Sequence, residues 1–211
     1  MVARAPILLT GAPGAGKSRL APALAAQLGL ECVDLDARVA ARAGMPVAAL
    51  IQARGEPAFR ALERELLEGI LGLPAPCVVA LGGGALVSTS LRRRALREAA
   101  VLRLDAPREV LLRRVVEGPP RPLVTSAKDP ARALNELLDA RDDGYAEAHL
   151  SLRSDGGDVA ALAREAARAL SAPLPLVVPS ARGATACTSA RCETLRPRGR
   201  GSSRGRRGCS A

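Results

Sequence analysis

The sequence predicts an α/β fold in which helices cover both faces of a parallel β-sheet. Apolar strand-like runs alternate with helical patterns along residues 1–171, and a glycine-rich turn joins the first strand to the first helix. Of the 211 residues, 48% are hydrophobic but only 1% are aromatic. A core of Leu, Val and Ala is typical of helices packed on a parallel sheet.

The predicted elements follow one another in a regular order. Apolar strand candidates lie at 5–10, 31–34, 77–81, 100–104 and 149–153. Helical patterns lie at 17–28, 36–43, 46–53, 56–72, 88–98, 107–117, 129–147 and 157–171. Asp129-Pro130 and Gly55-Glu56-Pro57 are helix start signals. Residues 118–127 are rich in Pro and have no helical period, which predicts a loop of the length typical of a lid.

The turn after the first strand carries the most specific motif. GAPGAGKS at 11–18 matches the pattern G-x-x-x-x-G-K-[ST], whose backbone N–H groups cradle phosphates. The positive end of the following helix also favours a bound anion. We therefore expect Lys17 to reach the β- and γ-phosphates of a nucleotide and Ser18 to bind Mg²⁺. The alternative is a chance turn in a chain rich in Gly and Ala.

Two carboxylates follow the second predicted strand. Residues two apart on an extended strand point the same way, so Asp34 and Asp36 are expected to face the crevice at the carboxyl end of the sheet. One would serve Mg²⁺ and the other an alcohol. The alternative is that Asp36 caps the next helix while Asp34 is solvated.

The third predicted strand runs directly into Gly82, Gly83 and Gly84. Three glycines let a ligand approach the main chain closely, because no side chain stands in the way. A flexible turn is the alternative.

Two arginines are predicted to face a binding crevice. Arg141 falls on the apolar face of the helix at 129–147, where a buried cation needs an anionic partner or a solvated cavity. Arg60 lies beside an apolar stripe, with Glu63 three residues on and able to orient it. Two converging arginines suit a carboxylate ligand. For each of them a structural ion pair is the alternative.

Two further arginines belong to the predicted lid region. Arg121 lies within the lid, where its charge would close over a phosphoryl group during transfer, unless it is merely solvated. Arg114 lies near the base of the lid.

Most of the formal net charge of +10 lies in residues 172–211, which hold eight arginines and one glutamate. This stretch of Arg, Gly, Ser and Pro has no sustained period, so we predict a disordered tail. It is either an electrostatic nucleic-acid contact or a GC-rich frame read out of phase. For the domain itself, the scarcity of aromatic residues argues against base stacking.

Composition also excludes several kinds of site. The five cysteines form no C-x-x-C pair and His149 is the single histidine, so a zinc site is not expected. Cys32 and Cys77 lie in apolar runs and are expected to be buried thiols. Neither a signal peptide nor an apolar run long enough to span a membrane is evident, which predicts a cytoplasmic protein.

The ordered set of motifs resembles the shikimate kinase family over about residues 5–171. The motifs are GAPGAGKS, the Asp34/Asp36 pair, GEPAFRALE (55–63), LGGGA (81–85), RPL (121–123) and RDDGY (141–145). The resemblance implies a three-layer α/β/α P-loop kinase fold of the nucleoside-monophosphate-kinase type. Its five-stranded parallel sheet would have the order 2-3-1-4-5, with a lid loop. The implied reaction is MgATP-dependent phosphorylation of the shikimate 3-hydroxyl to shikimate 3-phosphate, by a monomer, in aromatic amino acid biosynthesis.

The resemblance also implies roles for individual residues. The implied catalytic residues are Lys17, Asp36 and Arg121. The implied ATP-binding residues are Gly11, Gly14, Ala15, Gly16, Lys17, Ser18, Arg19, Arg114 and Arg121. The implied shikimate-binding residues are Asp36, Arg60, Gly82, Gly83, Gly84 and Arg141. The implied Mg²⁺ ligands are Ser18 and, through water, Asp34.

The chain departs from the family pattern in two places. Val39-Ala40 stands where family members often carry Ile-Glu, and the loop at 154–158 lacks the arginine that often lies beside adenine, although Arg153 directly precedes it. Two alternatives remain open: a related kinase for gluconate or a nucleotide, and a ligand-sensing domain without turnover.

Overall fold

The computed structural model describes residues 5–118, 129–155, 157–175, 177–178 and 186–187. Its centre is a five-stranded parallel sheet with the order β2-β3-β1-β4-β5. The strands are β1 (Ile7–Gly11), β2 (Glu31–Asp34), β3 (Cys77–Ala80), β4 (Ala100–Asp105) and β5 (Leu150–Arg153). In the middle of the sheet Leu9 pairs with Ala80 of β3 and Leu102 of β4. The predicted α/β class and strand order are confirmed.

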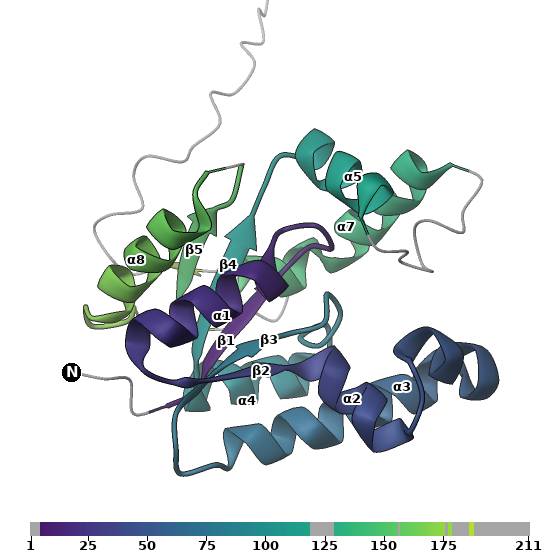
Figure 1. Ribbon diagram of the computed structural model, residues 1–211, viewed down its shortest axis with the longest axis horizontal. Coiled ribbons are helices and arrows are strands. Elements are labelled where there is room, and N and C mark those ends of the chain that lie inside the picture. The colour runs from purple at the N-terminus through teal and green to yellow at the C-terminus, as the bar shows by residue number, and fades with distance from the viewer. Residues whose placement is uncertain (1–4, 119–128, 156, 176, 179–185, 188–211) are drawn as a thin grey trace, which may run out of the picture.

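Seven helices of the described residues surround this sheet (Figure 1). They are α1 (Lys17–Leu28), α2 (Leu35–Ala43), α3 (Val47–Leu71), α4 (Thr89–Glu98), α5 (Arg108–Glu117), α7 (Pro130–Ala146) and α8 (Val159–Leu170). The alternation of side chains along β1 shows how the core divides between two faces. Ile7 and Leu9 pack in the cluster that includes α1 and α8, whereas Leu8 packs in the cluster that includes α3 and α4.

Helix boundaries follow the local signals in the chain. The predicted cap is present before α7, where the Asp129 carboxylate accepts a hydrogen bond of 3.0 Å from the Arg132 backbone N–H. Helix α3 joins the two helices predicted at 46–53 and 56–72, but Gly55 interrupts it with non-helical dihedrals (φ 81°, ψ 162°). This kink separates the two segments as the sequence predicted.

Two predictions about the second strand need correction. Asp36 lies in the first turn of α2 and not on an extended strand, so the argument that both carboxylates point the same way was wrong. Asp34 is the residue that caps α2, and its carboxylate accepts a 3.0 Å hydrogen bond from the Ala37 backbone N–H. Cys77 is buried as expected, but Cys32 is exposed because β2 is an edge strand.

The lid and the tail fall largely outside the described residues. Most of the predicted loop at 118–127, including Arg121, lies outside the described residues, so its placement stays a prediction. In the tail, β6 (Val177–Val178) and β7 (Ala186–Cys187) form an antiparallel pair that the sequence pattern did not predict. The predicted disorder of 172–211 otherwise concerns residues that the structure does not describe.

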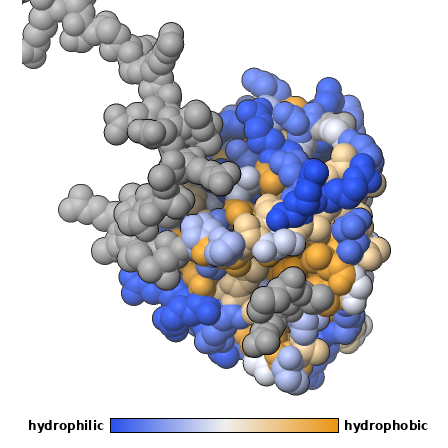
Figure 2. Space-filling model, turned by 90° about the vertical axis from the view of Figure 1, so that its left-hand side faces the viewer, coloured by the Kyte–Doolittle hydropathy of each residue, from blue (hydrophilic) through white to orange (hydrophobic). Residues whose placement is uncertain are grey.

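Figure 2 shows one face on which hydrophilic residues surround a smaller apolar area. Among the described residues the exposed large hydrophobic side chains are Leu73, Val87 and Val116. In the part of the chain that the structure describes, no helix combines the length and the apolar character that crossing a membrane requires.

Candidate active site

The phosphate-binding loop joins β1 to α1 and is shaped by glycine. Gly14 has a φ of +82°, and a Cβ atom there would lie 3.0 Å from the Leu111 carbonyl oxygen at the start of α5. Only glycine takes this conformation without strain, and only glycine lets the loop lie so close to α5. The loop is therefore pressed against the protein rather than projecting from it.

Lys17 is the buried cation of this loop. It is 9% exposed, and its Nζ donates hydrogen bonds of 2.7 Å to the Gly11 carbonyl and 2.9 Å to the Ala12 carbonyl. Because Lys17 is the first residue of α1, its charge adds to the positive end of the helix. The arrangement concentrates positive charge and backbone N–H groups where phosphates would bind.

A cavity of about 800 Å³ opens beside the loop. Its lining contains most of the residues predicted to bind ATP, together with three of the residues predicted to bind the substrate. These residues are Gly14, Ala15, Gly16, Lys17, Ser18, Arg19, Arg114, Asp36, Gly82 and Gly83. The volume is in the range of small-molecule and cofactor sites, which is about 300–1,000 Å³.

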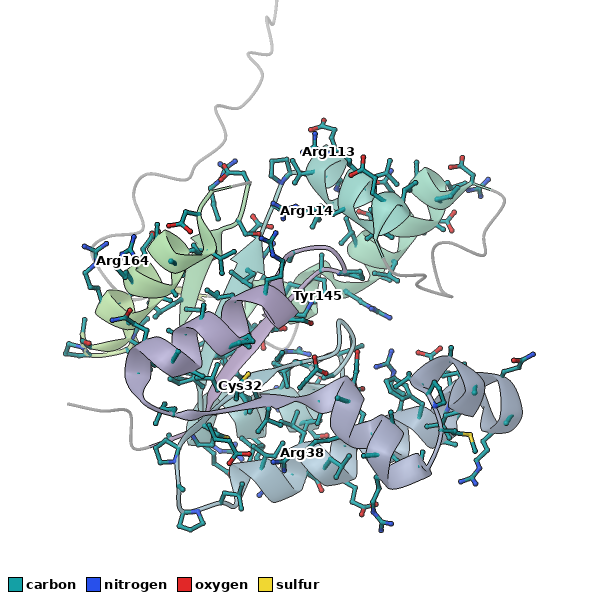
Figure 3. All side chains as sticks on the ribbon, in the orientation of Figure 1. Cys32, Arg38, Arg113, Arg114, Tyr145 and Arg164 are labelled. Atoms are coloured by element: carbon teal, nitrogen blue, oxygen red, sulfur yellow. The ribbon has the colours of Figure 1, made fainter. Side chains whose placement is uncertain are left out.

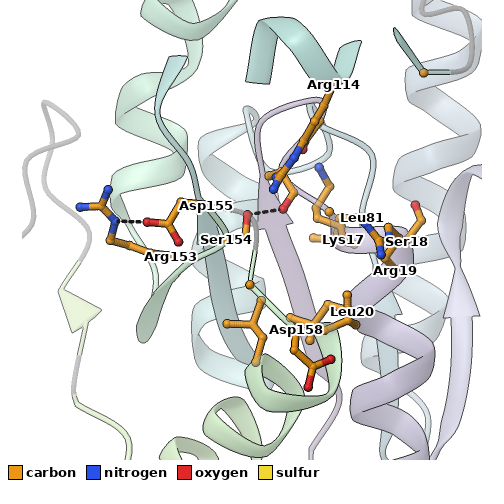
Figure 4. A pocket seen from close by; sticks show the side chains of 18 of the residues that line it. Lys17, Ser18, Arg19, Leu20, Leu81, Arg114, Arg153, Ser154, Asp155 and Asp158 are labelled. Atoms are coloured by element: carbon orange, nitrogen blue, oxygen red, sulfur yellow. Dashed lines mark hydrogen bonds and ion pairs between the residues drawn. The ribbon is translucent and has the colours of Figure 1, made fainter. Parts of the chain in front are cut away.

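Two side chains hold the phosphate-binding loop from opposite sides of this cavity (Figure 4). Arg114 Nη1 on α5 donates a 3.2 Å hydrogen bond to the Gly14 carbonyl. Ser154, directly after β5, donates a 2.5 Å hydrogen bond from Oγ to the Ala15 carbonyl. Arg153 also lines the cavity and forms an ion pair of 3.5 Å with Asp155. Helix α5 and the loop after β5 thus meet at this larger cavity.

A second cavity of about 340 Å³ lies on the other side of the glycine segment. Arg60 from α3 and Arg141 from α7 both line it, as does Gly84. Gly82 and Gly83 line the larger cavity, so the three consecutive glycines stand between the two cavities. The predicted convergence of the two arginines is therefore present in the structure.

Arg60 is held by two carboxylates of its own helix. It forms ion pairs of 2.9 Å with Glu56 and 2.6 Å with Glu63. Burial alone would lower the pKa of Arg60, but the charges and hydrogen bonds of Glu63 and Glu56 raise it above its ordinary value. Arg60 is thus a fixed, permanently charged group at the wall of the smaller cavity.

Glu63 is the most buried acid of this site, with its side chain 2% exposed. Burial raises the pKa of Glu63, and the nearby charge of Asp36 raises it further, while Arg60 and Arg141 lower it. The net pKa lies above the ordinary value. Glu63 therefore depends on its two arginine neighbours for its charge, and it links them electrostatically.

The glycine segment touches these charged groups directly. A Cβ atom at Gly82 would lie 2.5 Å from Glu63 Oε1 and 2.8 Å from Asp36 Oδ1. A Cβ atom at Gly84 would lie 2.5 Å from the Arg60 guanidinium. At these distances a Cβ atom would force the Glu63, Asp36 or Arg60 side chain to move, so glycine allows the close approach without displacing these charged groups.

Arg141 and Tyr145 form the α7 side of the smaller cavity. The Tyr145 hydroxyl donates a hydrogen bond to the Gly83 carbonyl, and Arg141 Nη1 lies near the same glycine. Burial raises the pKa of Tyr145 above its ordinary value, although Arg141 opposes that shift. No described acidic side chain lies within 4.0 Å of the Arg141 guanidinium, in contrast to Arg60. Arg141 thus brings a positive charge to the cavity without an ion pair from this part of the protein.

Comparison with known proteins places this geometry in a family. The family model described as shikimate kinase matches residues 13–171. The chain belongs to the shikimate kinase family. A shikimate kinase of Caulobacter vibrioides is 41% identical over 148 residues, which is 70% of this chain and 73% of that protein. One of Nitrobacter winogradskyi is 38% identical over 148 residues, covering 70% and 68% of the two chains.

A solved structure supports the same assignment. The shikimate kinase of Acinetobacter baumannii in complex with shikimate is 30% identical, with a TM-score of 0.75 over 80% of this chain and 94% of that one. The chain is therefore a P-loop kinase, and the family resemblance seen in the sequence motifs is confirmed. The individual residue roles remain predictions that the geometry described above can support.

Sequence reasoning missed two contacts of this site. The motif RDDGY (141–145) ends in Tyr145, for which the sequence predicts no role, yet its hydroxyl donates a hydrogen bond to the Gly83 carbonyl. The signal was available, because the single tyrosine of the chain lies four residues after Arg141 and so on the same helix face. Ser154 gave no such signal, because its partner Ala15 is 139 residues away.

Proposed function

We propose that this protein transfers the γ-phosphoryl group of ATP to the 3-hydroxyl of shikimate, giving shikimate 3-phosphate. The carrying observation is the pair of cavities on either side of Gly82–Gly84. One is lined by Lys17 and Ser18, and the other by Arg60 and Arg141. Such a pair suits a nucleotide on one side and a small carboxylic acid on the other.

Recognition of the substrate rests on charge and shape. The planar guanidinium groups of Arg60 and Arg141 can each bind a carboxylate through two parallel hydrogen bonds. Asp36 lies where the glycine segment separates the cavities, within reach of a hydroxyl group that points toward the nucleotide. In this pose the substrate is fixed at its carboxylate end and presents its reacting oxygen at the other end.

Catalysis is then mainly positioning and electrostatic stabilisation. Lys17 and the N–H groups of the loop would hold the transferring phosphoryl group, and Arg121 of the predicted lid would add positive charge. Asp36 would accept the proton of the attacking hydroxyl. Because the substrate site is walled by Glu63 and the two arginines, its ring would be kept in one orientation during transfer.

The residues present fit a magnesium ion. Mg²⁺ is usually bound by one or two protein oxygens together with phosphates and water. Ser18 offers a hydroxyl in the nucleotide cavity. Asp34 is not among the residues that line this cavity, so it would act through water, with the carboxylate oxygen that does not cap α2. When bound, Mg²⁺ supplies charge neutralisation of the phosphates. As the co-substrate is ATP, we further infer a cytoplasmic enzyme, and we propose that it acts as a monomer.

A coupled assay of ADP release tests the proposed reaction. Purified protein with MgATP should turn over shikimate but neither gluconate nor nucleoside monophosphates. The methyl ester of shikimate, which lacks the carboxylate charge, should be a much poorer substrate through a higher KM. Turnover of gluconate or a nucleotide in place of shikimate would overturn the assignment.

Lys17→Ala is the matched control for this assay. The substitution should remove most of the turnover while leaving shikimate binding, measured by calorimetry, nearly intact, because Lys17 lines only the nucleotide cavity. A variant that retained turnover would show that the measured activity does not come from this site. Binding without turnover in the wild-type protein would favour the ligand-sensing alternative.

A further inference from the structure

The most deeply buried ion pair of the described residues lies behind the substrate cavity. Arg92 of α4 and Glu147, directly after α7, meet at 2.7 Å between Nε and Oε2. Their side chains are 6% and 0% exposed. Both groups are removed from water, so only the ion pair and its hydrogen bonds offset the desolvation cost of the two charges.

Arg92 also binds the chain that follows the glycine segment. Its Nη1 donates hydrogen bonds of 2.9 Å to the Leu86 carbonyl and 3.0 Å to the Val87 carbonyl. One guanidinium therefore joins three parts of the fold: α4, the loop after β3, and the end of α7. Arg92 and Glu147, the two partners of the ion pair, are 55 residues apart along the chain.

Two of the parts joined in this way, α7 and the loop after β3, form walls of the substrate cavity, and α3 forms another. Helix α7 carries Arg141 and Tyr145, and the loop carries Gly82–Gly84. The last turn of α7 packs directly on the loop. A Cβ atom at Gly144 would lie 3.5 Å from the Leu86 carbonyl oxygen and 3.9 Å from Arg92 Nη1. A change at the ion pair would therefore move Arg141 relative to the glycine segment.

Stability alone does not explain such a pair. Replacing a buried ion pair by apolar residues of similar volume is often neutral or stabilising, because desolvation offsets the attraction between the charges. What an apolar pair cannot supply is the set of directed hydrogen bonds from one group to a carboxylate and two carbonyls. The geometry thus favours a role in positioning.

We propose that Arg92 and Glu147 are positioning residues that set the distance between Arg141 and the Gly82–Gly84 segment, and so the affinity for the carboxylate-bearing substrate. This inference rests on the proposed function of the cavity. Neither residue touches the cavity itself: they act through Leu86 and the last turn of α7.

The double variant Arg92→Met/Glu147→Leu separates positioning from stability. It should remain folded, because the apolar pair fills the same space. We expect its KM for shikimate to rise about tenfold, since a displaced binding group weakens substrate positioning, while its KM for ATP stays unchanged. The control is Arg94→Met/Glu98→Leu, which removes a 2.9 Å ion pair from the same helix at a partly exposed place. This control should leave both KM values at wild-type levels.

A spectroscopic measurement tests the same inference without activity. Tyr145 is the single tyrosine of a chain that has no tryptophan, so tyrosine fluorescence reports on the surroundings of this side chain alone, which include its contact with Gly83. Figure 3 labels this side chain in the interior, and it is 6% exposed. Acrylamide should quench its fluorescence weakly in the wild type and the control, and more strongly in the double variant.

The outcomes separate this inference from the proposed function. Stronger quenching in the double variant supports the positioning role even if the wild type fails to phosphorylate shikimate. Unchanged quenching and unchanged KM for shikimate in the folded double variant would overturn it. If that variant does not fold, Arg92→Lys takes its place. Arg92 makes its three contacts from two nitrogens, Nε and Nη1, whereas a lysine carries all its donors on one nitrogen and cannot reproduce this spacing. The same changes are therefore expected, and their absence is equally decisive.

Discussion

Arg60 and Arg141 line one cavity but stand in different electrostatic surroundings. Arg60 is bound by Glu56 and by the buried Glu63, whereas Arg141 contacts the glycine segment and Tyr145. A substrate carboxylate would therefore be the main anionic partner of Arg141, while Arg60 would share its charge between substrate and protein. The two residues should differ in what they contribute to folding.

Alanine substitutions measure this difference. Arg141→Ala should weaken shikimate binding by roughly 2–5 kcal/mol, because the substrate carboxylate loses its charged partner in a buried site. Its melting temperature should stay close to that of the wild type. Arg60→Ala should also lower the free energy of unfolding by about 1–3 kcal/mol, since Glu63 is then buried without its hydrogen-bond donor. Calorimetry of binding and thermal unfolding checks both. Equal losses of stability in Arg60→Ala and Arg141→Ala would contradict the prediction that Arg60 alone contributes to folding.

At the scale of elements, the segment between β3 and α4 works through the absence of side chains. Gly84→Ala would place a methyl group 2.5 Å from the Arg60 guanidinium, which lies at the end of a flexible side chain. The guanidinium would move away from Glu63 rather than the backbone giving way. We expect the KM for shikimate to rise about tenfold, together with a loss of stability no larger than that of Arg60→Ala, because Glu63 loses part of its contact with Arg60. Steady-state kinetics and thermal melts measure the two effects.

Gly69→Ala is the control for this glycine substitution. Gly69 lies in α3, where a Cβ atom would meet nothing within 4 Å. Alanine there should raise the free energy of unfolding by about 0.5–1 kcal/mol and leave the kinetics unchanged. An equal rise in the KM for shikimate in Gly84→Ala and Gly69→Ala would show that Gly84 has no specific role in substrate binding.

The junction of β4 and β5 gives the protein a pH dependence. The Val101 backbone N–H donates a 3.0 Å hydrogen bond to His149 Nδ1, which requires the neutral ring. Burial lowers the pKa of His149 below its ordinary value of 6.5, although a hydrogen bond to the Leu96 backbone opposes this shift. Between the two pKa values the unfolded chain binds more protons than the folded one, so stability rises with pH there. The stability that neutral His149 contributes should be fully present above about pH 7 and should decrease as the pH falls below about 6.5.

His149→Asn tests this dependence, because the amide oxygen can still accept from Val101 without titrating. Urea unfolding at several pH values should show a weaker dependence below pH 6.5 in the variant. The wild type and the variant have to be compared because Glu63 also makes stability depend on pH. Its raised pKa makes stability fall as the pH rises in the acidic range, which is opposite to the effect of His149. Identical curves for the two proteins would contradict a role for His149, the single histidine of the chain.

At the scale of the whole molecule, most of the net positive charge and the candidate active site lie in different parts of the chain. The family model ends at residue 171, and most of the positive charge follows it. A chain that ends after 178 keeps Leu174 and Val177, which pack on the two core clusters. We expect its kcat/KM for shikimate to equal that of the full chain, while any salt-sensitive binding of DNA is lost. A large loss of turnover would show that the tail takes part in the reaction.

Much of this fold could be predicted because its signals are local. Apolar runs, the glycines and the cap at Asp129 act over a few residues, and the helix at 17–28 begins and ends as predicted. The error at Asp36 arose where a strand turns directly into a helix, because the extended geometry of 31–34 does not continue past Asp34. Element boundaries depend on such details, which apolar periodicity does not resolve.

The sequence by itself determined the phosphate-binding loop, the α/β class and the convergence of Arg60 and Arg141 on one cavity, since these rest on short motifs and helix periodicity. Only the tertiary structure decided which groups hold them in place. Ser154 reaches Ala15, and Arg92 reaches Glu147 and the loop after β3, across long stretches of chain. Such contacts form when the sheet brings distant loops to one edge, and no local pattern of residues records them.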